Sequence, residues 1–371
     1  MSDRKLLILN VATFSGTIIG VGLFSLPYIT LKVGFWVMLF YFIVLGALIY
    51  LVHKYFGEVA IKTPDFKRYP GFAKYYLGDW GEKIAFISSI IGTFGALLAY
   101  LIVGGEFLTQ LLSPIFGGDN LIYTLIYFFI GALFIFLGIK AIQKIEFLGL
   151  ILFSVILVLI FWAGKDFINI GNLFLHNSLN LKNFFLPYGA IIFSLSGISL
   201  IPEIEENLKD KKNLLTKIIF ISILIPIIIY LFFIFLILGI CGENTTETAL
   251  TGLVDFLGYR IAVLGYLFGL ITTFTSFITM GLTLKKIFHY DLKLNKKLSW
   301  FITCFIPLFL FLIGVNQFIP VISFVGGVMC GIDGILILLM YKKINPQKKI
   351  IYPLSLIFIL GIIYEIVYFV K

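Results

Sequence analysis

Long hydrophobic runs alternate with short polar connectors along the whole chain. A run of about 20 apolar residues crosses the hydrocarbon core of a bilayer as a helix. The pattern therefore predicts an all-α membrane protein with about eleven transmembrane helices, at residues 6–30, 33–53, 83–112, 121–139, 146–164, 183–202, 214–240, 257–284, 298–314, 317–341 and 350–370.

The connectors are too short to hold a separate soluble domain, so residues 1–371 are expected to form a single domain. The connector at 54–82 is long enough to be structured, and we expect it to be amphipathic. The first run begins close to Met1 and lacks a small-residue cleavage site, which indicates a retained helix rather than a signal peptide.

Basic residues concentrate on one side of this predicted arrangement. Of the 28 Lys and Arg residues, 23 lie in segments on the same side as the N-terminus. Because basic residues accumulate in cytoplasmic loops, we expect a multi-pass protein of the cell (plasma) membrane with its N-terminus in the cytoplasm and its C-terminus outside. The charges sit in connectors rather than on a tail or one helix face, so the net charge of +9 predicts no nucleic-acid partner.

Composition agrees with a membrane protein and offers no metal site. The chain is 60% hydrophobic and 13% charged, with a mean hydropathy of +1.08, whereas soluble domains carry about 25% charged residues. The cysteines have irregular spacing, without a disulfide framework or a metal-binding pair, and the histidines are expected at span ends or in loops: Cys241, Cys304 and Cys330, and His53, His176 and His289.

The first span contains the segment GTIIGVGLFSLP, from Gly16 to Pro27, with glycines and a proline at mid-membrane. Such residues weaken a helix and allow its backbone to unwind. Unwound backbone survives inside a membrane only where protein or a watery cavity surrounds it. The segment therefore predicts a break near Ile19–Gly22 and a binding site there.

The sixth span is interrupted in a similar way. It reads LPYGAIIFSLSGISLIPEIEEN, with serines and a glycine between Ser194 and Ser199 at mid-span. Two breaks at corresponding places in two five-helix halves of opposite direction indicate an inverted repeat, here about 6–164 and 183–341, with 350–370 as an extra helix. The alternative for each break is a simple kink or close packing of small residues.

A broken helix exposes free N–H groups where one half begins and free C=O groups where the other half ends. The N–H end favours a carboxylate and the C=O end favours a cation. We expect the amides of Val21, Gly22 and Leu23 to hold a substrate carboxylate, and the carbonyls around Phe193–Ser196 to receive an ammonium group. This arrangement suits a zwitterionic amino acid.

The first-span motif resembles that of the amino acid/auxin permease family, and especially its aromatic amino acid permeases. GALLAYLIVGGEFL in the third span, FSLSGISLIPEIEEN in the sixth and the glycine-rich tenth span are similar to family segments, so the resemblance covers nearly the whole chain. It implies the LeuT-type 5+5 fold and secondary transport of amino acids. The expected substrate-binding residues are Thr17, Gly20, Val21, Gly22, Leu23, Tyr100, Phe193, Ser194, Ser196 and Gly197, with Tyr100 placed by family position.

The resemblance also implies a cation site between the first break and hydroxyls of the eighth span, GLITTFTSFITMG. The expected ligands are carbonyls of Gly16 and Ile19 with the hydroxyls of Thr272, Thr275 and Ser276. Hydroxyl and carbonyl oxygens suit a small hard cation, although such hydroxyls also simply bond within helices. In some relatives of this fold, a lysine in the fifth span takes the place of the ion. The fifth span here, 146–164, has no mid-span lysine, which favours sodium. A proton remains open, because aromatic permeases are generally proton-coupled.

Ionisable residues inside spans are functional candidates by default. Glu106 matches the family's acidic position, and Asp333 is either a protonation site or a buried partner of a hydroxyl. Glu365 is expected to be interfacial or a packing residue. The acids after Pro202 form either a solvated face or a gate that pairs with lysines: Glu203, Glu205 and Glu206.

These expectations combine into a symporter that imports neutral amino acids, aromatic or hydrophobic ones among them, by alternating access. We expect sodium or a proton as the coupling ion, no cofactor, an amino acid and the lipid bilayer as partners, and function as a monomer. The alternative is an amino acid-sensing receptor of the same fold, such as a germinant receptor subunit, without sustained transport. A membrane enzyme is disfavoured, because no clustered carboxylates or histidines form a catalytic group.

Overall fold

The computed structural model of the chain describes residues 2–138, 143–175, 183–208 and 211–370. Its described part is helical, with no strands, which confirms the predicted fold class. The elements that correspond to the expected spans are, in order, α1 (Asp3–Ile18) with η1 (Val21–Ser25) and α2 (Leu26–Val33); α3 (Phe35–Lys62); α5 (Asp79–Phe116); α6 (Asn120–Leu137); α7 (Gln143–Gly164); α8 (Pro187–Leu195) with η4 (Ile198–Leu200) and α9 (Ile201–Leu208); α10 (Leu215–Cys241); α12 (Tyr259–Lys286); α13 (Lys296–Leu312); α14 (Phe318–Phe324) with η9 (Val325–Cys330) and α15 (Gly331–Ile344); and α16 (Ile351–Val370).

Length and apolar composition identify most of these as membrane spans. Within the described residues, seven helical stretches are each long and apolar enough to cross a membrane. The pair formed by Asp3–Ile18 and Val21–Val33, bent by 52°, makes an eighth if the two helices are counted as one span. The other three expected spans correspond to α7, α13 and α16. The predicted number of about eleven is therefore consistent with the structure.

The long connector at 54–82 contains a short helix, α4 (Tyr69–Leu77), as its amphipathic pattern indicates. α5 then begins at Asp79, four residues earlier than predicted, because Gly78 adopts a φ of +80° that ends α4 and lets the chain turn. Asp79 and Glu82 in the first turn of α5 favour this start, since acidic groups stabilise the N-terminal end of a helix.

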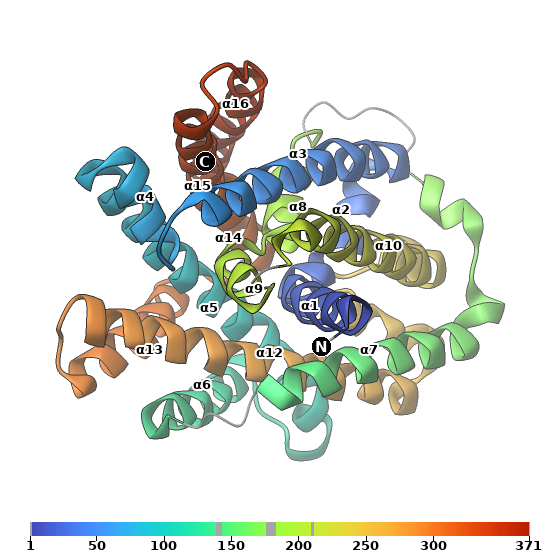
Figure 1. Ribbon diagram of the computed structural model, residues 1–371. Helices are drawn as coiled ribbons and strands as arrows, with labels where there is room; N and C mark the ends of the chain where they lie inside the picture. The colour runs from blue at the N-terminus through green and yellow to red at the C-terminus, as the bar shows by residue number, and fades with distance from the viewer. Residues whose placement is uncertain (1, 139–142, 176–182, 209–210, 371) are drawn as a thin grey trace.

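The two broken spans lie in the interior of the helix bundle. Figure 1 shows α1, α8 and α9 near the centre, with α3, α10, α7, α12 and α5 around them. In an 18-residue apolar window of Pro187–Leu208 and of Phe318–Ile344, 72% of the residues are buried, against 39–56% in the windows of the other single helices that are long and apolar enough to span a membrane. Interior helices can carry unwound backbone because neighbouring protein satisfies it.

The tenth span contains a feature that the sequence pattern did not predict, the π-helical segment η9. Here Gly326 lies directly against the backbone of Gly189 and Phe193 in α8, with no room for a Cβ atom. Small residues allow such close approach between membrane helices. η9 therefore holds α8, the first half of the sixth span, by backbone contact.

The remaining short elements join these helices. They are η2 (Lys165–Phe167), η3 (Ile170–Phe174), η5 (Lys212–Leu214), η6 (Gly242–Asn244), η7 (Leu250–Leu253), α11 (Val254–Leu257) and η8 (Ile287–Asp291). Thr248, which precedes η7, donates to Glu106 of α5 at 3.1 Å, so the connector after α10 is fastened to the third span.

Candidate functional site

The first span breaks where the glycine motif predicts. α1 ends at Ile18, Ile19 is extended, and Gly20 has φ −133° and ψ −159° before η1 begins at Val21. Leu23 donates its N–H to Gly20 at 3.2 Å. The amides of Val21 and Gly22 open the new half-helix, where N–H groups have no acceptor within the helix.

The sixth span breaks at Ser196 and Gly197. α8 ends at Leu195, Ser196 has a ψ of 131°, and η4 begins at Ile198. The break therefore falls inside the predicted stretch Ser194–Ser199. It separates α8 from α9, which leaves carbonyl groups free at the end of α8.

The two breaks contact each other directly. A Cβ atom on Gly22 would overlap Ser194 Oγ and would lie 3.0 Å from the ring of Phe193. On the other side, a Cβ on Gly197 would overlap the Phe14 ring of α1. Glycine at both breaks therefore allows the two unwound segments to lie side by side.

Tyr230 of α10 joins the carbonyl ends of both broken helices. Its hydroxyl lies 2.9 Å from the Ile18 carbonyl oxygen and 2.8 Å from the Ser194 carbonyl oxygen, and the side chain is fully buried. A tyrosine hydroxyl has a single proton to donate, so the two carbonyls share it. The pair retains unused acceptor capacity that a further donor can meet.

His53 of α3 binds the backbone of the sixth span at its break, where Gly197 precedes η4. The Gly197 N–H donates to His53 Nε2 at 3.0 Å, and His53 Nδ1 lies 2.7 Å from the Ile49 carbonyl oxygen. These partners require a neutral ring with its proton on Nδ1. The expectation that His53 lies at a span end is wrong, because α3 continues to Lys62 and His53 is fully buried within it.

The partners of the two breaks create an electrostatic difference between them. His53 satisfies the Gly197 amide, whereas the amides of Val21 and Gly22 stand at the positive end of a half-helix. The Ile18 and Ser194 carbonyls converge on one donor. The arrangement can hold a negative group at the start of η1 and a positive group near the two carbonyls.

Several other expected substrate residues surround these groups. A Cβ on Gly20 would lie 3.2 Å from the hydroxyl of Tyr100 in α5, so Tyr100 reaches the first break. Phe193 and Ser196 keep part of their surface accessible, whereas Leu23 and Ser194 are buried. Thr17 is exposed, and its hydroxyl donates to the Thr13 carbonyl within α1. The structure thus brings these residues together, apart from the Thr17 side chain.

The expected cation ligands are not brought together in the same way. α1, with Gly16, packs against α10 and α7, and among the described residues it has no extensive contact with α12. The hydroxyls of Thr272 and Thr275 donate to carbonyls of α12 itself, at 3.0 Å to Phe268 and 3.1 Å to Thr272. Ser276 beside them is partly exposed. A shared cation site would require α1 and α12 to approach each other.

Three carboxyl groups inside the spans have definite partners. Ser88 of α5 donates to Asp333 at 2.5 Å, which favours the interpretation of Asp333 as the buried partner of a hydroxyl. Glu365 of α16 is buried and accepts the Gly189 N–H at 3.2 Å, which supports a packing role. Glu106 accepts from Thr248 of the connector after α10.

Of the acids after Pro202, Glu205 is buried and pairs with Lys212 at 2.5 Å, whereas Glu203 and Glu206 are exposed. The sequence interpretation as a solvated face therefore fits two of the three acids. Glu205 instead joins α9 to η5, the turn that leads into α10.

Together, the two broken helices and the bundle around them define a membrane protein of the LeuT-type fold. A structure of MhsT in complex with L-phenylalanine matches with a TM-score of 0.63 at 15% identity, over 98% of this chain and 99% of that one. Mhp1, a nucleobase-cation-symport-1 family transporter, matches in a closed conformation with bromovinylhydantoin bound (TM-score 0.64, 14% identity, 97% and 90% of the two chains). Its inward-facing conformation matches with a TM-score of 0.70 at 12% identity, over 97% and 88% of the two chains.

The chain belongs to the tryptophan/tyrosine permease family, which it matches over residues 4–367. This assignment agrees with the resemblance to aromatic amino acid permeases drawn from the motifs, while the wider amino acid/auxin permease name is not established by it. A search of the curated proteins gives no significant match to the chain.

Proposed function

We propose that this permease imports neutral amino acids, with aromatic side chains as the favoured class, by cation-coupled symport. The observation that carries the proposal is the convergence of the two helix breaks. Free amides at Val21 and Gly22 suit a carboxylate, and the carbonyls of Ile18 and Ser194 suit an ammonium group. Both ends of an amino acid are thus met by backbone groups, without a buried charged side chain.

The preference for an aromatic side chain is supported by the comparisons. The family takes its name from tryptophan and tyrosine, and MhsT, of similar fold, binds L-phenylalanine in its structure. Aromatic side chains from several helices reach the breaks in this chain, among them Tyr100 and Phe193. Aromatic pairs add attraction beyond the burial of apolar area, so they favour an aromatic substrate over an aliphatic one.

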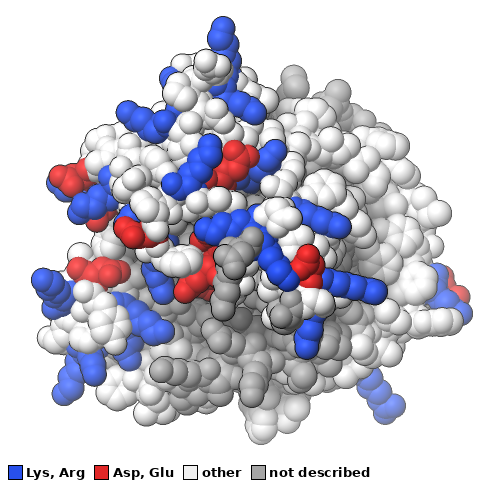
Figure 2. Space-filling model, in the orientation of Figure 1, with Lys and Arg blue, Asp and Glu red and all other residues white. Residues whose placement is uncertain are grey.

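We also propose that the N-terminus lies in the cytoplasm, that the C-terminus lies outside, and that the protein works as a monomer in the cell membrane. Figure 2 supports this orientation, because many Lys and Arg side chains cover the face that bears α4, α9 and the start of α1. Basic residues gather on the cytoplasmic side of membrane proteins. We call this surface the basic face.

Uptake by proteoliposomes is the experiment that tests the function. The purified protein is reconstituted and given each of the twenty labelled amino acids, with and without a sodium gradient, at two external pH values. We expect concentrative uptake of tryptophan, tyrosine or phenylalanine that requires one of the two cation gradients. Binding of an amino acid without concentrative uptake would instead support a receptor, and uptake confined to other amino acids would contradict the aromatic preference.

Thr275 provides a separate test of the coupling site. A hydrogen bond to a charged group contributes about 1.5–3 kcal/mol. If the contact between the Thr275 hydroxyl and Na⁺ has a similar strength, Thr275→Ala should raise the sodium concentration for half-maximal uptake at least about tenfold. Thr283→Ala is the matched control: it removes an exposed hydroxyl that bonds the Thr279 carbonyl on the same helix. An unchanged sodium response in Thr275→Ala, with Thr283→Ala also unchanged, would reject this site.

A further inference from the structure

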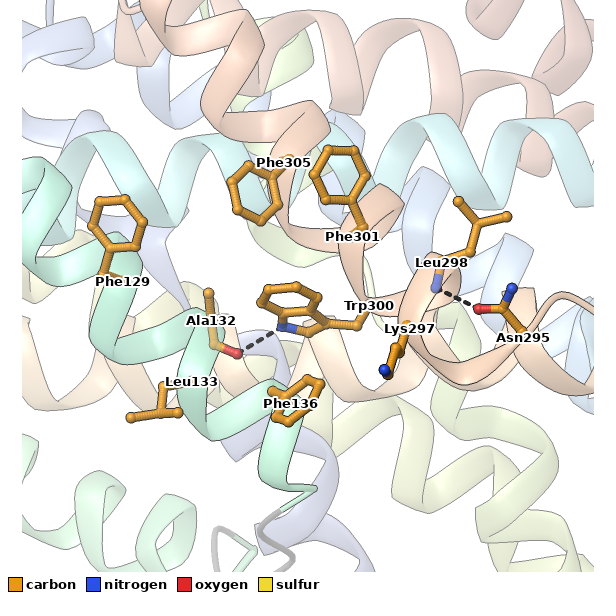
Figure 3. Close-up of a pocket in the computed structure, with 10 residues that line it drawn as sticks. All are labelled: Phe129, Ala132, Leu133, Phe136, Asn295, Lys297, Leu298, Trp300, Phe301 and Phe305. Atoms are coloured by element: carbon orange, nitrogen blue, oxygen red, sulfur yellow. Dashed lines mark hydrogen bonds between the residues drawn. The ribbon is translucent and has the colours of Figure 1, made fainter.

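A groove on the outer surface of the bundle runs between α6 and α13, away from the helix breaks. Its volume is about 800 Å³. Figure 3 shows the side chains that line it: Phe129, Ala132, Leu133 and Phe136 from α6, Asn295 just before α13, and Lys297, Leu298, Trp300, Phe301 and Phe305 from α13. α6 is long and apolar enough to span a membrane, and α13 beside it corresponds to one of the expected spans, so this groove would face the bilayer.

The walls of the groove are apolar. Four of the lining side chains are each about half exposed: Phe129 at 57%, Leu133 at 52%, Phe136 at 47% and Phe301 at 52%. The indole N–H of Trp300 donates to the Ala132 carbonyl at 2.8 Å, so the polar atom of this ring is already satisfied. The groove therefore offers hydrocarbon and aromatic surface, which suits an acyl chain.

One end of the groove is positively charged. Lys297 lines it and is exposed, and Lys296 precedes it at the first position of α13. Both cations stand at the positive end of a helix whose first turn contains no acidic residue. The partial positive charge at the N-terminal end of a helix repels basic side chains. An anion bound at this point would offset the repulsion between this helix end and the two lysines.

Lys285 has a different role at the same end. Its ammonium group donates to the Ile135 and Phe136 carbonyls at 2.8 and 3.0 Å, so it binds the last turn of α6. Among the residues that the structure describes, Lys297 is the charged side chain that lines the groove. Figure 2 shows further Lys and Arg side chains on the basic face over the region where Figure 1 places α13.

We propose that this groove binds an anionic phospholipid, with an acyl chain along the aromatic wall and the phosphate beside Lys297. Shape and charge agree: the apolar part lies among Phe129, Phe136 and Phe301, and the positive charge of Lys297 lies at one end of the groove, where α13 begins. Basic pockets between membrane helices on the cytoplasmic side hold anionic headgroups in this way. The site is separate from the transport site.

Trp300 makes the proposal directly measurable, because it lies in the groove and its fluorescence is quenched by a brominated acyl chain in contact with it. The other tryptophans, Trp36, Trp80 and Trp162, are exposed at 63%, 51% and 63%, so replacing all three with Phe should be tolerated. The full-length protein with Trp300 as its single tryptophan is reconstituted in phosphatidylcholine with increasing fractions of brominated phosphatidylglycerol or, separately, brominated phosphatidylcholine.

We expect brominated phosphatidylglycerol to reach half-maximal quenching at a mole fraction of lipid about fivefold lower than brominated phosphatidylcholine. A basic residue near the membrane surface attracts an anionic lipid by about 1 kcal/mol, which corresponds to about a fivefold preference. Lys297→Gln should remove the difference and Lys297→Arg should retain it. Lys343→Gln is the matched control, an exposed lysine that does not line the groove, and should change nothing. Equal quenching by the two lipids, or a preference that survives in Lys297→Gln, would overturn the proposal.

Discussion

Gly22→Ala is expected to reduce amino acid uptake at least about tenfold while the protein still inserts in the membrane. The added methyl group would overlap Ser194 Oγ and would lie 3.0 Å from the Phe193 ring. Overpacking of this kind costs about 1–3 kcal/mol. Because Gly22 is one of the amides that would hold the substrate carboxylate, the displacement falls directly on the proposed site. Initial uptake rates, normalised to the amount of protein in proteoliposomes, measure the effect.

Two further variants decide whether the clash causes the loss. Gly22→Ala combined with Ser194→Ala removes the oxygen that the new methyl group would overlap, so part of the uptake should return. Gly92→Ala is the matched control, since its Cβ would meet Met329 at an ordinary 3.5 Å. Normal uptake by Gly22→Ala would refute the assignment of the first break to the substrate site.

Tyr230→Phe is expected to destabilise the protein by about 1–3 kcal/mol, the cost of leaving a buried polar group unsatisfied. The substitution removes the hydroxyl that the Ile18 and Ser194 carbonyls share. We expect a lower unfolding temperature and, at low substrate concentration, uptake reduced about tenfold, since both carbonyl ends lose their common anchor. Thermal unfolding in detergent and uptake at several substrate concentrations measure the two effects.

Tyr127→Phe is the matched control for Tyr230→Phe. Both tyrosines are almost fully buried, but the Tyr127 hydroxyl has no hydrogen-bond partner among the described residues. Replacing it should leave stability unchanged or slightly improved. If the two variants had the same unfolding temperature and uptake, the bridging role of Tyr230 would be refuted.

The breaks themselves were predictable from the sequence because they depend on local backbone properties. Gly20 and Gly22 weaken the first span, and Ser196 and Gly197 weaken the sixth, at the positions where the structure interrupts both helices. The glycine-rich tenth span was predicted only as a span. Its π-helical turn at Val325–Cys330 follows from close contact with α8, which no local pattern contains.

The partners of the breaks were not predictable in the same way. His53 and Tyr230 lie 144 and 36 positions in sequence from the groups that they bind, Gly197 and Ser194. Each sits in an apolar span with many other aromatic residues, so neither type nor spacing distinguishes it. The signal available for His53 was a polar residue within a long hydrophobic run. Because the span was predicted to end at residue 53, whereas α3 continues to Lys62, His53 was assigned to the span end rather than to the interior.

The sequence by itself determined the membrane-spanning class, the approximate spans and the two interruptions, since hydrophobic length and glycine content act over a few residues at a time. Only the tertiary structure decided which groups complete the site. The bridging hydroxyl of Tyr230, the His53 ring on Gly197 and the separation of α1 from α12 arise from contacts between distant helices. The physical reason is that a buried polar group must find a partner wherever packing brings one, and packing is a property of the whole bundle.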